Sequence, residues 1–570
     1  MLIDISFIIF IWFLLALVFI AIGLSFQKFF WPAILDFQST ITAFWFGWGI
    51  VLAALQWWHL FLPVNWNAQV FFFLFGILCL VLNKQHVTAL LRSCFLDHGY
   101  FTILVFCFVV LTACFALRGE LPYDAGLYHL QYIKWVSQFA IIPGIGNLHV
   151  RFAFNSSYFL YLALLKPITA PVAYYYFASG LLVSICIIQS LYPVFKVFKA
   201  DPRDRFDCRD LMSISFIFVW LFLACKKITT TSPDLAIYLM GFTVSMYLSE
   251  MAFQLLTRTE RIRNVLIILF LSMVGISLKA SFLVFGACSI IAALSIFLSF
   301  EKTDSSCLRK ENARIFIFVF ICCAILSLWL IRDDIQSGYP IFPSPIGGIN
   351  VDWKIPSQTA ISLLNVVKSW AQAPGEDPLR VLGDHHWLVP WMKSIYKCHK
   401  HDVILPVSLF LGGLLSSFFL FRKLYSEYGA LRPILFFFPP ACCLLAWFIS
   451  APEPRFAGAS FLILGIGMIS MLISLAPIWW QRRYIIGVFC CSFILCLGLF
   501  LINKRRAGGQ YSIPTVQVEK RITNSGLLVY VPLNSDQCWD ASLPCSPVFN
   551  ANLTLRHRQD IQKGFKIQQP

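Results

Sequence analysis

The sequence predicts an all-α protein that crosses a membrane many times. Hydrophobic residues make up 59% of its 570 residues and charged residues only 13%, a balance that water-soluble proteins of this size do not have. Apolar runs recur from end to end of the chain, and about 20 apolar residues are needed to cross the hydrocarbon core as a helix. Such runs satisfy their backbone hydrogen bonds as helices and lack the alternation of barrel strands, so a helical bundle is expected.

About fourteen membrane-spanning helices are expected from these runs. They lie near residues 3–25, 40–60, 66–83, 99–117, 172–196, 210–226, 235–256, 264–278, 281–299, 315–331, 403–421, 433–449, 456–476 and 484–502. The first run is expected to remain as a span, because no basic segment precedes it and no small-residue cleavage site follows it. Three spans in residues 1–98 thus precede a transmembrane core, residues 99–502, and a tail, residues 503–570.

Lysine and arginine gather in five short loops, which indicate the orientation. Their basic residues are Arg203, Arg205 and Arg209; Arg258, Arg261 and Arg263; Lys302, Arg309, Lys310 and Arg314; Arg422, Lys423 and Arg432; and Arg482 and Arg483. With fourteen spans, all five loops fall on one side, which is expected to be the cytoplasm. Both termini and the loops 118–171 and 332–402 are then external, although Lys504, Arg505 and Arg506 oppose this for the tail.

Two segments of the external regions call for their own interpretation. Residues 155–170 are apolar but contain Lys166, and as a span they would move the densest basic loop outside, so a helix on the outer surface is expected. The tail holds a strand-like run, GLLVYVPL at 526–533, and is expected to form a small mixed α/β cap. Cys538 and Cys545 bracket CWDASLPC and are candidates for a disulfide if the tail lies outside the cytoplasm.

Composition also bears on partners and cofactors. The net charge of +16 suits basic loops against anionic lipid headgroups, and no soluble basic domain with interleaved aromatics points to nucleic acid. Most of the other cysteines lie in apolar runs, where they act as small hydrophobes. The histidines of loop 332–402 have no standard zinc spacing, and Asp333 and Asp334 point about 100° apart on a helix, so no metal or other cofactor is expected.

The loop 118–171 opens with RGELPYDAGLYHLQYIKW, which carries the main candidate for chemistry. Asp124 lies just beyond a span, among Tyr123, Tyr128 and His129, where a partly desolvated carboxylate can take a proton from a bound hydroxyl. The alternative is a helix cap, because a helix is expected to follow Asp124.

His129 in this loop is a candidate for substrate binding, and so are four further residues near the external ends of spans. Asp234 follows Pro233 in TTTSPDL, with helix capping as its alternative role. Lys279 interrupts an apolar stretch and is either functional or snorkels to the headgroups. Arg455 in APEPRF and Arg332 in LIRDD can each bind a phosphate bidentately, or merely contact lipid headgroups.

An external loop that opens with an acidic residue after an early span resembles the GT-C class of membrane glycosyltransferases. These enzymes transfer sugars from polyprenyl-phosphate donors at the external face of the membrane. The resemblance spans roughly residues 99–476 and implies that Asp124 is the general base, with Asp234 as the second-loop acid and Arg455 as the donor-phosphate ligand. Asp124 has no adjacent second acid, unlike the Asp-x-Asp pattern of the metal-dependent members, and three spans precede the core.

A narrower resemblance covers most of the chain. PYDAGLYHLQYIKW, PGIGNLHVRFAFNSS and DQCWDASLPCSPVFN are similar to a family of uncharacterised bacterial integral membrane proteins, which implies no particular activity. The expected localisation is therefore a bacterial inner (plasma) membrane, with the site on the periplasmic side.

The expected function is inverting transfer of a sugar from a polyprenyl-phosphate donor to a glycan or lipid acceptor of the cell envelope. Asp124 would deprotonate the acceptor hydroxyl, with Arg455 and Lys279 stabilising the departing phosphate. A polymerase or ligase of surface polysaccharide is a chemically close alternative. A transporter or flippase of lipid-linked sugars is a different one, but it predicts ionisable residues along the middle of the membrane, where the sequence has almost none. A non-catalytic scaffold is also open.

Overall fold

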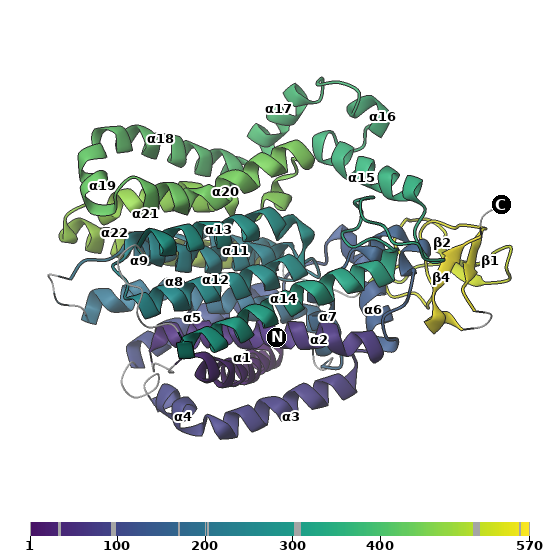
Figure 1. The fold of residues 1–570 in the computed structure, drawn as a ribbon, viewed down its shortest axis with the longest axis horizontal. Helices are drawn as coiled ribbons and strands as arrows, with labels where there is room; N and C mark the ends of the chain where they lie inside the picture. Colours follow the sequence, from purple (N-terminus) through teal and green to yellow (C-terminus); the bar gives the residue numbers. More distant parts are fainter. Residues whose placement is uncertain are drawn as a thin grey trace.

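The computed structural model describes residues 2–31, 36–92, 99–168, 172–199, 201, 204–300, 309–504, 513–557 and 560–568. It is a bundle of long helices with a small β region at one extreme of its long axis (Figure 1). Within these residues, twelve helices are long and apolar enough to cross a membrane, or thirteen with the bent pair α3 and α4 counted as one span. The predicted all-α, multi-pass fold is thus confirmed.

The long helices follow the expected spans closely. They are α1 (Leu2–Phe30), α2 (Phe37–Phe61), α3 (Trp66–Leu82) with α4 (Lys84–Arg92), α5 (Gly99–Ala116), α8 (Ala178–Lys199), α9 (Cys208–Ser215) with α10 (Ile217–Lys227), α11 (Asp234–Phe253), α12 (Arg258–Leu278), α13 (Leu283–Phe300), α14 (Arg309–Ser337), α18 (Leu405–Phe419), α20 (Leu431–Ser450), α21 (Ser460–Ser474) and α22 (Ile478–Lys504).

The count by helix length is lower than about fourteen, since two expected spans are short. The span expected at 456–476 is the 15-residue helix α21, and that at 66–83 is α3, which meets α4 at a bend of 79°.

One end of the bundle, which we call the capped end, carries three polar pieces. The first contains the short helices η2 (Ala125–His129), α6 (Leu130–Gln138), η3 (Ile145–Asn147), η4 (Val150–Ala153), α7 (Ser157–Leu165) and η5 (Tyr174–Tyr176). The second contains α15 (Ser357–Gln372), α16 (Pro378–Val381), α17 (Leu388–Cys398) and η8 (Lys400–Ile404). The third is the β region, which lies beside α6 (Figure 1).

The basic loops meet at the opposite end. Arg205 pairs with Glu427 at 4.0 Å, and Arg482 Nη1 donates to the Val197 carbonyl at 3.3 Å. Arg261 and Arg432 both lie over the Phe300 ring, each 4.5 Å from its centroid. Four of the five predicted basic loops therefore lie together, as the orientation argument requires. Arg203 and Lys302 lie outside the described residues.

Within the segment 155–170, residues Ser157–Leu165 form the helix α7, which does not lie on the surface. All nine residues of α7 are buried, and the helix packs against α2 and α6. The prediction of a surface helix was wrong because it treated apolarity as affinity for lipid. The apolar side chains are instead covered by neighbouring protein helices, a contact that hydropathy does not distinguish from lipid.

The tail, from residue 513, forms two small antiparallel sheets on the capped end. β1 (Val518–Ile522) pairs with β2 (Leu528–Pro532), which matches the strand-like run at 526–533, and β3 (Leu553–Leu555) pairs with β4 (Phe565–Ile567). The single-turn helix η10 (Ile561–Lys563) precedes β4. Cys538 and Cys545 form a disulfide. The tail thus lies on the same side as the loop that follows α5. Of the basic residues that opposed this placement, Arg505 and Arg506 fall outside the described residues.

Glycine allows α1 and α2 to pack in backbone contact. A Cβ added to Gly23 would lie 1.8 Å from the Ala43 carbonyl oxygen, and one on Gly47 would lie 1.8 Å from that of Phe19. We expect Gly23→Ala to force the helices apart and cost at least about 2 kcal/mol, seen as a lower thermal midpoint in detergent. Gly412→Ala and Gly487→Ala are matched controls, because their added Cβ atoms meet nothing within 4 Å. Equal midpoints for Gly23→Ala and the controls would contradict this packing.

Candidate functional site at the capped end

Five charged side chains from separate parts of the chain meet at the capped end. We call them the charged cluster: Asp124, Arg151, Asp234, Lys279 and Arg455. Asp124 lies between α5 and η2, Asp234 begins α11, and Lys279 ends α12. Arg151 belongs to η4, and Arg455 belongs to η9 (Pro454–Ala457), the turn between α20 and α21.

Asp124 is paired with two arginines. Arg455 Nη1 donates to Asp124 Oδ2 at 3.1 Å, although the residues are 331 positions apart, and Arg151 Nη1 lies 3.8 Å from Asp124 Oδ1. The Asp124 side chain makes no capping hydrogen bond to the helix that follows it. The alternative role considered from the sequence, a helix cap, is therefore not the one that its carboxylate has in the structure.

Asp234 is paired with Lys279, whose Nζ donates to its carboxylate. The N-cap of α11 is Pro233 rather than Asp234, so this carboxylate also faces a cation instead of closing its helix. The Phe456 ring joins the two pairs. Its centroid lies 4.5 Å from Lys279 Nζ and 5.1 Å from Arg455 Cζ, both within the range of cation–π attraction.

The charged cluster carries a net positive charge that is only partly open to solvent. Three cations against two carboxylates leave a formal charge of +1. Exposed fractions of the side chains run from 17% for Asp234 to 38% for Arg455. Burial alone would lower the pKa of Arg455, but the carboxylates of Asp234 and Asp124 raise it above its ordinary value. Arg455 thus interacts electrostatically with both acids, and the two ion pairs form one connected group.

His129 lies behind the charged cluster rather than at its open face. Its ring is fully buried, with Nδ1 2.9 Å from Thr231 Oγ1 and the Phe159 ring centroid 5.2 Å away. Burial lowers its pKa to about 4, although Asp124 and Asp234 act in the opposite direction. The ring is therefore neutral at pH 7 and packs inside the protein next to the charged cluster. Because it is buried, a substrate cannot contact it directly, so the predicted role of His129 as a substrate ligand does not fit the structure.

The histidine has a consequence for stability against pH. Because the pKa of His129 falls from 6.5 to about 4 on folding, the unfolded chain binds more protons between these values, and stability falls as the pH drops through this window. We expect His129→Gln to remove about 2 kcal/mol of the loss between pH 7 and pH 5. The measurement is the thermal midpoint at pH 7 and pH 5, with the exposed His385→Gln as control. An unchanged pH dependence in His129→Gln would contradict the assignment.

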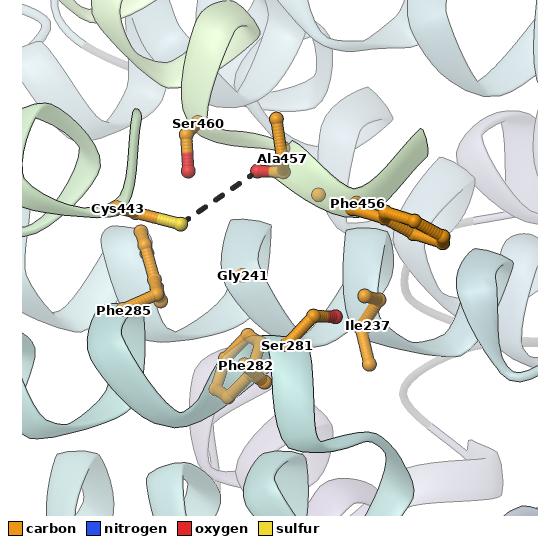
Figure 2. Close-up of a pocket in the computed structure, with 11 residues that line it drawn as sticks. Ile237, Gly241, Ser281, Phe282, Phe285, Cys443, Phe456, Ala457 and Ser460 are labelled. Atoms are coloured by element: carbon orange, nitrogen blue, oxygen red, sulfur yellow. Dashed lines mark hydrogen bonds between the residues drawn. The ribbon is translucent and has the colours of Figure 1, made fainter. Parts of the chain in front are cut away.

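A narrow, mainly apolar pocket adjoins the charged cluster on the side toward the middle of the helix bundle. Figure 2 shows its walls, which come from α11, from η6 (Ala280–Phe282) and α13, from α20, and from the turn that follows Arg455. Phe456 lines both the pocket and the charged cluster. Ser281 Oγ is buried here without a hydrogen-bond partner among the described residues. The other residues that line the pocket are Ile237, Gly241, Phe282, Phe285, Cys443, Ala457, Gly458, Ala459 and Ser460.

Arg332 lies apart from the charged cluster. Its side chain is fully buried near the end of α14, where Nε donates to Asn155 Oδ1 at 3.3 Å and Nη1 lies 2.9 Å from His59 Nδ1. Within the described residues, no contact connects it to the charged cluster. The expectation of a headgroup or substrate ligand at this position does not fit, because neighbouring helices enclose the guanidinium.

Two members of the site were not singled out from the sequence. Arg151 lies in the quoted motif PGIGNLHVRFAFNSS, and its charge beside the Asp124 loop was the available signal. Phe456 follows Arg455 directly, but nothing local distinguishes a cation platform from a core phenylalanine. In the part of the chain that the structure describes, no group of three or more His, Cys, Asp or Glu side chains is arranged to hold a metal ion.

These features define a multi-pass membrane protein with a charged site at one end of its helix bundle. A family model described as "Domain of unknown function (DUF8201)" matches residues 5–462, so the chain belongs to this family. The match includes every residue of the charged cluster and ends before the tail. Comparisons with curated proteins and with solved structures give no match.

Proposed function

We propose that the protein is a membrane glycosyltransferase of the GT-C type that transfers a sugar from a polyprenyl-phosphate donor to a cell-envelope glycan or lipid. The observation that carries this proposal is the meeting of Asp124, Asp234, Lys279 and Arg455 at one end of the bundle. These residues were selected from the sequence by chemistry alone, and they are distributed over 331 positions. A common role is a simpler explanation for their meeting than chance.

The charge and shape of the site suit a lipid-linked phosphate. A net positive cluster at headgroup depth attracts a phosphate, and the guanidinium fork of Arg455 can hold two of its oxygens. The adjoining pocket has a mainly apolar lining but has room for no more than about one water molecule, so it must widen before the first part of an apolar chain can enter. The charge of the cluster is thus the part of the site that matches the donor directly.

In the proposed reaction, donor phosphate takes Arg455 from its ion pair, so that Asp124 stays paired with Arg151 through Oδ1 and its Oδ2 becomes free to act as a base. Asp124 accepts the proton of the acceptor hydroxyl as the hydroxyl oxygen attacks the anomeric carbon. The bond between that carbon and the phosphate oxygen breaks, and polyprenyl phosphate leaves with the bonding electrons. Arg455 and Lys279 stabilise the charge that develops on this oxygen, and the single displacement inverts the anomeric centre.

We further propose that the capped end faces the outside of a bacterial inner membrane. Disulfides persist in oxidising compartments, which supports an external position for Cys538 and Cys545. The basic loops at the opposite end support the same orientation, because such loops favour the cytoplasmic side.

The test is transfer by the purified protein in liposomes, with labelled polyprenyl-phosphate sugars as donors and envelope glycans or lipids as acceptors. Acceptor-dependent release of polyprenyl phosphate, together with a labelled acceptor, would support the proposal. Movement of intact donor between leaflets without bond cleavage would overturn it in favour of a transporter or flippase. Activity only with lipid-linked oligosaccharides would indicate a polysaccharide polymerase or ligase instead.

A further inference from the structure

The tail contains a short loop that contacts the chain on both sides of Asp124. We call residues 534–545 the disulfide loop, because the bond between Cys538 and Cys545 closes its second part, and residues 534–537 lead into it. Both cysteines are fully buried. The loop lies beyond residue 462, where the family match ends, so the match does not cover it. Its position beside the charged cluster is known from the tertiary structure alone.

Hydrogen bonds hold Tyr123, immediately before Asp124, and Gly126, two residues after it. Gln537 Nε2 donates to the Tyr123 carbonyl at 2.8 Å, and the Tyr123 hydroxyl donates to Asp536. On the other side, the Trp539 backbone N–H donates to the Gly126 carbonyl at 2.9 Å. The Asp124 backbone is thus flanked by two direct links to the disulfide loop.

Further bonds attach the loop to α6, which continues from the Asp124 turn. Gln131 Nε2 donates to the carbonyls of Trp539 and Ala541 at 3.1 and 2.9 Å, and the Gln131 side chain is buried. Lys134 Nζ pairs with Asp540 Oδ1 at 3.2 Å. The contacts therefore extend over one continuous stretch, from Tyr123 to Lys134.

Trp539 is the centre of this contact. Its indole lies against Gly126, where an added Cβ would come within 2.5 Å of the ring. Trp539 has a φ of +45°, a left-handed conformation that is unfavourable for a bulky residue and persists only where the surroundings enforce it. Among the described residues, no other non-glycine residue has a positive φ. The turn it covers, η2, is a π-helical segment, an irregular form that is often found at functional sites.

We propose that the disulfide loop, through Trp539, is a positioning element that holds the Asp124 turn in register with Arg455 and Arg151. Opening the disulfide releases this turn and slows chemistry without weakening donor binding, so the activity depends on an oxidised tail. The inference rests on the proposed function for its effect on catalysis. Its structural part, the restraint of residues 122–134, is independent of that function.

The structural part is tested by hydrogen exchange, monitored by mass spectrometry on the full-length protein in detergent or nanodiscs. We expect Cys538→Ser/Cys545→Ser to speed exchange in residues 122–134 by about tenfold or more. Cys398→Ser, at an exposed free cysteine, is the control and should change nothing. Unchanged exchange in residues 122–134 after loss of the disulfide would overturn the proposal, whatever the activity shows.

The catalytic part is tested with substitutions at Trp539 in the liposome transfer assay. We expect Trp539→Ala to lower kcat about tenfold or more, with little change in KM for the donor and no shift in the pH profile. Trp539→Phe keeps an aromatic ring against Gly126 and should restore most of the rate. Val548→Ala, at an exposed residue of the same tail, should act as wild type.

A double-mutant cycle shows whether Trp539 acts through Gly126. Gly126→Ala should also lower kcat, because its Cβ would displace the indole, and its effect should be clearly less than additive with that of Trp539→Ala. Additive effects would overturn a shared contact as the cause.

If faster exchange appears while the wild type shows no transfer with any donor, the restraint stands and the proposed function fails. If transfer occurs but kcat is unaffected in every variant, the positioning role fails.

Discussion

Asp124→Asn is expected to reduce sugar transfer by about 10²- to 10⁴-fold, the usual contribution of a general base. The amide keeps the size of the carboxylate but cannot accept the hydroxyl proton. Donor binding should change little, because Arg455 and Lys279 remain. The loss should therefore fall on kcat rather than on KM for the donor. The measurement is the initial rate of acceptor labelling in the liposome assay at saturating donor.

Two comparisons separate a lost base from a damaged fold. Glu120→Gln is a matched control in the same loop, since Glu120 is exposed and lies outside the charged cluster. The thermal midpoint of Asp124→Asn should stay close to that of the wild type, because partly exposed ion pairs contribute only about 0–1 kcal/mol. Transfer at the wild-type rate by Asp124→Asn would remove Asp124 from the mechanism and leave it as an ion-pair partner.

Arg455→Met is expected to lower kcat/KM for transfer by about 10²- to 10³-fold, with weakened binding of the donor. The substitution removes the group that links Asp124 and Asp234, and with it the fork that would hold two phosphate oxygens. Arg455→Lys keeps the charge without the fork, so it should recover only part of the loss. Binding is measured directly as thermal stabilisation by polyprenyl phosphate, which the wild type should show and Arg455→Met should lose.

Arg380→Met is the control for the removal of a cation from this end of the protein, because Arg380 is exposed on α16. The roles proposed for Asp124 and Arg455 also lead to opposite expectations for their variants. Asp124→Asn should bind polyprenyl phosphate and fail to transfer, whereas Arg455→Met should fail to bind it. The reverse pattern would show that the assignment of base and phosphate ligand is wrong.

The spans and the side on which polar residues gather were predictable from the sequence. A run of apolar residues determines a helix locally, because each helix makes its own backbone hydrogen bonds and needs only its length to cross the hydrocarbon. The basic loops at 205–209 and 422–432 could be assigned to one end by counting the spans between them, because each span carries the chain to the other side. The pairing of Cys538 with Cys545 followed from their separation and polar context.

The choice of candidate residues was also available from the sequence, but their grouping was not. Asp124, Asp234, Lys279 and Arg455 stood out as charged residues at the external ends of apolar spans, where a carboxylate can act as a base and a cation can bind phosphate. Arg332 met the same criterion and lies in a separate buried group with His59 and Asn155. Hydropathy indicates how deep in the membrane a residue lies. It does not indicate the direction in which the side chain faces.

What the sequence by itself determined is thus the membrane fold, its two unlike ends and a short list of charged candidates. Only the tertiary structure decided which of these meet, that α7 is buried among protein helices, and that Trp539 of the tail covers the Asp124 turn. The physical reason is that helix–helix contacts depend on side-chain shape at close range, as at Gly23 and Gly47. A contact between residues 331 positions apart has no local signature, because many helices must first pack to create it.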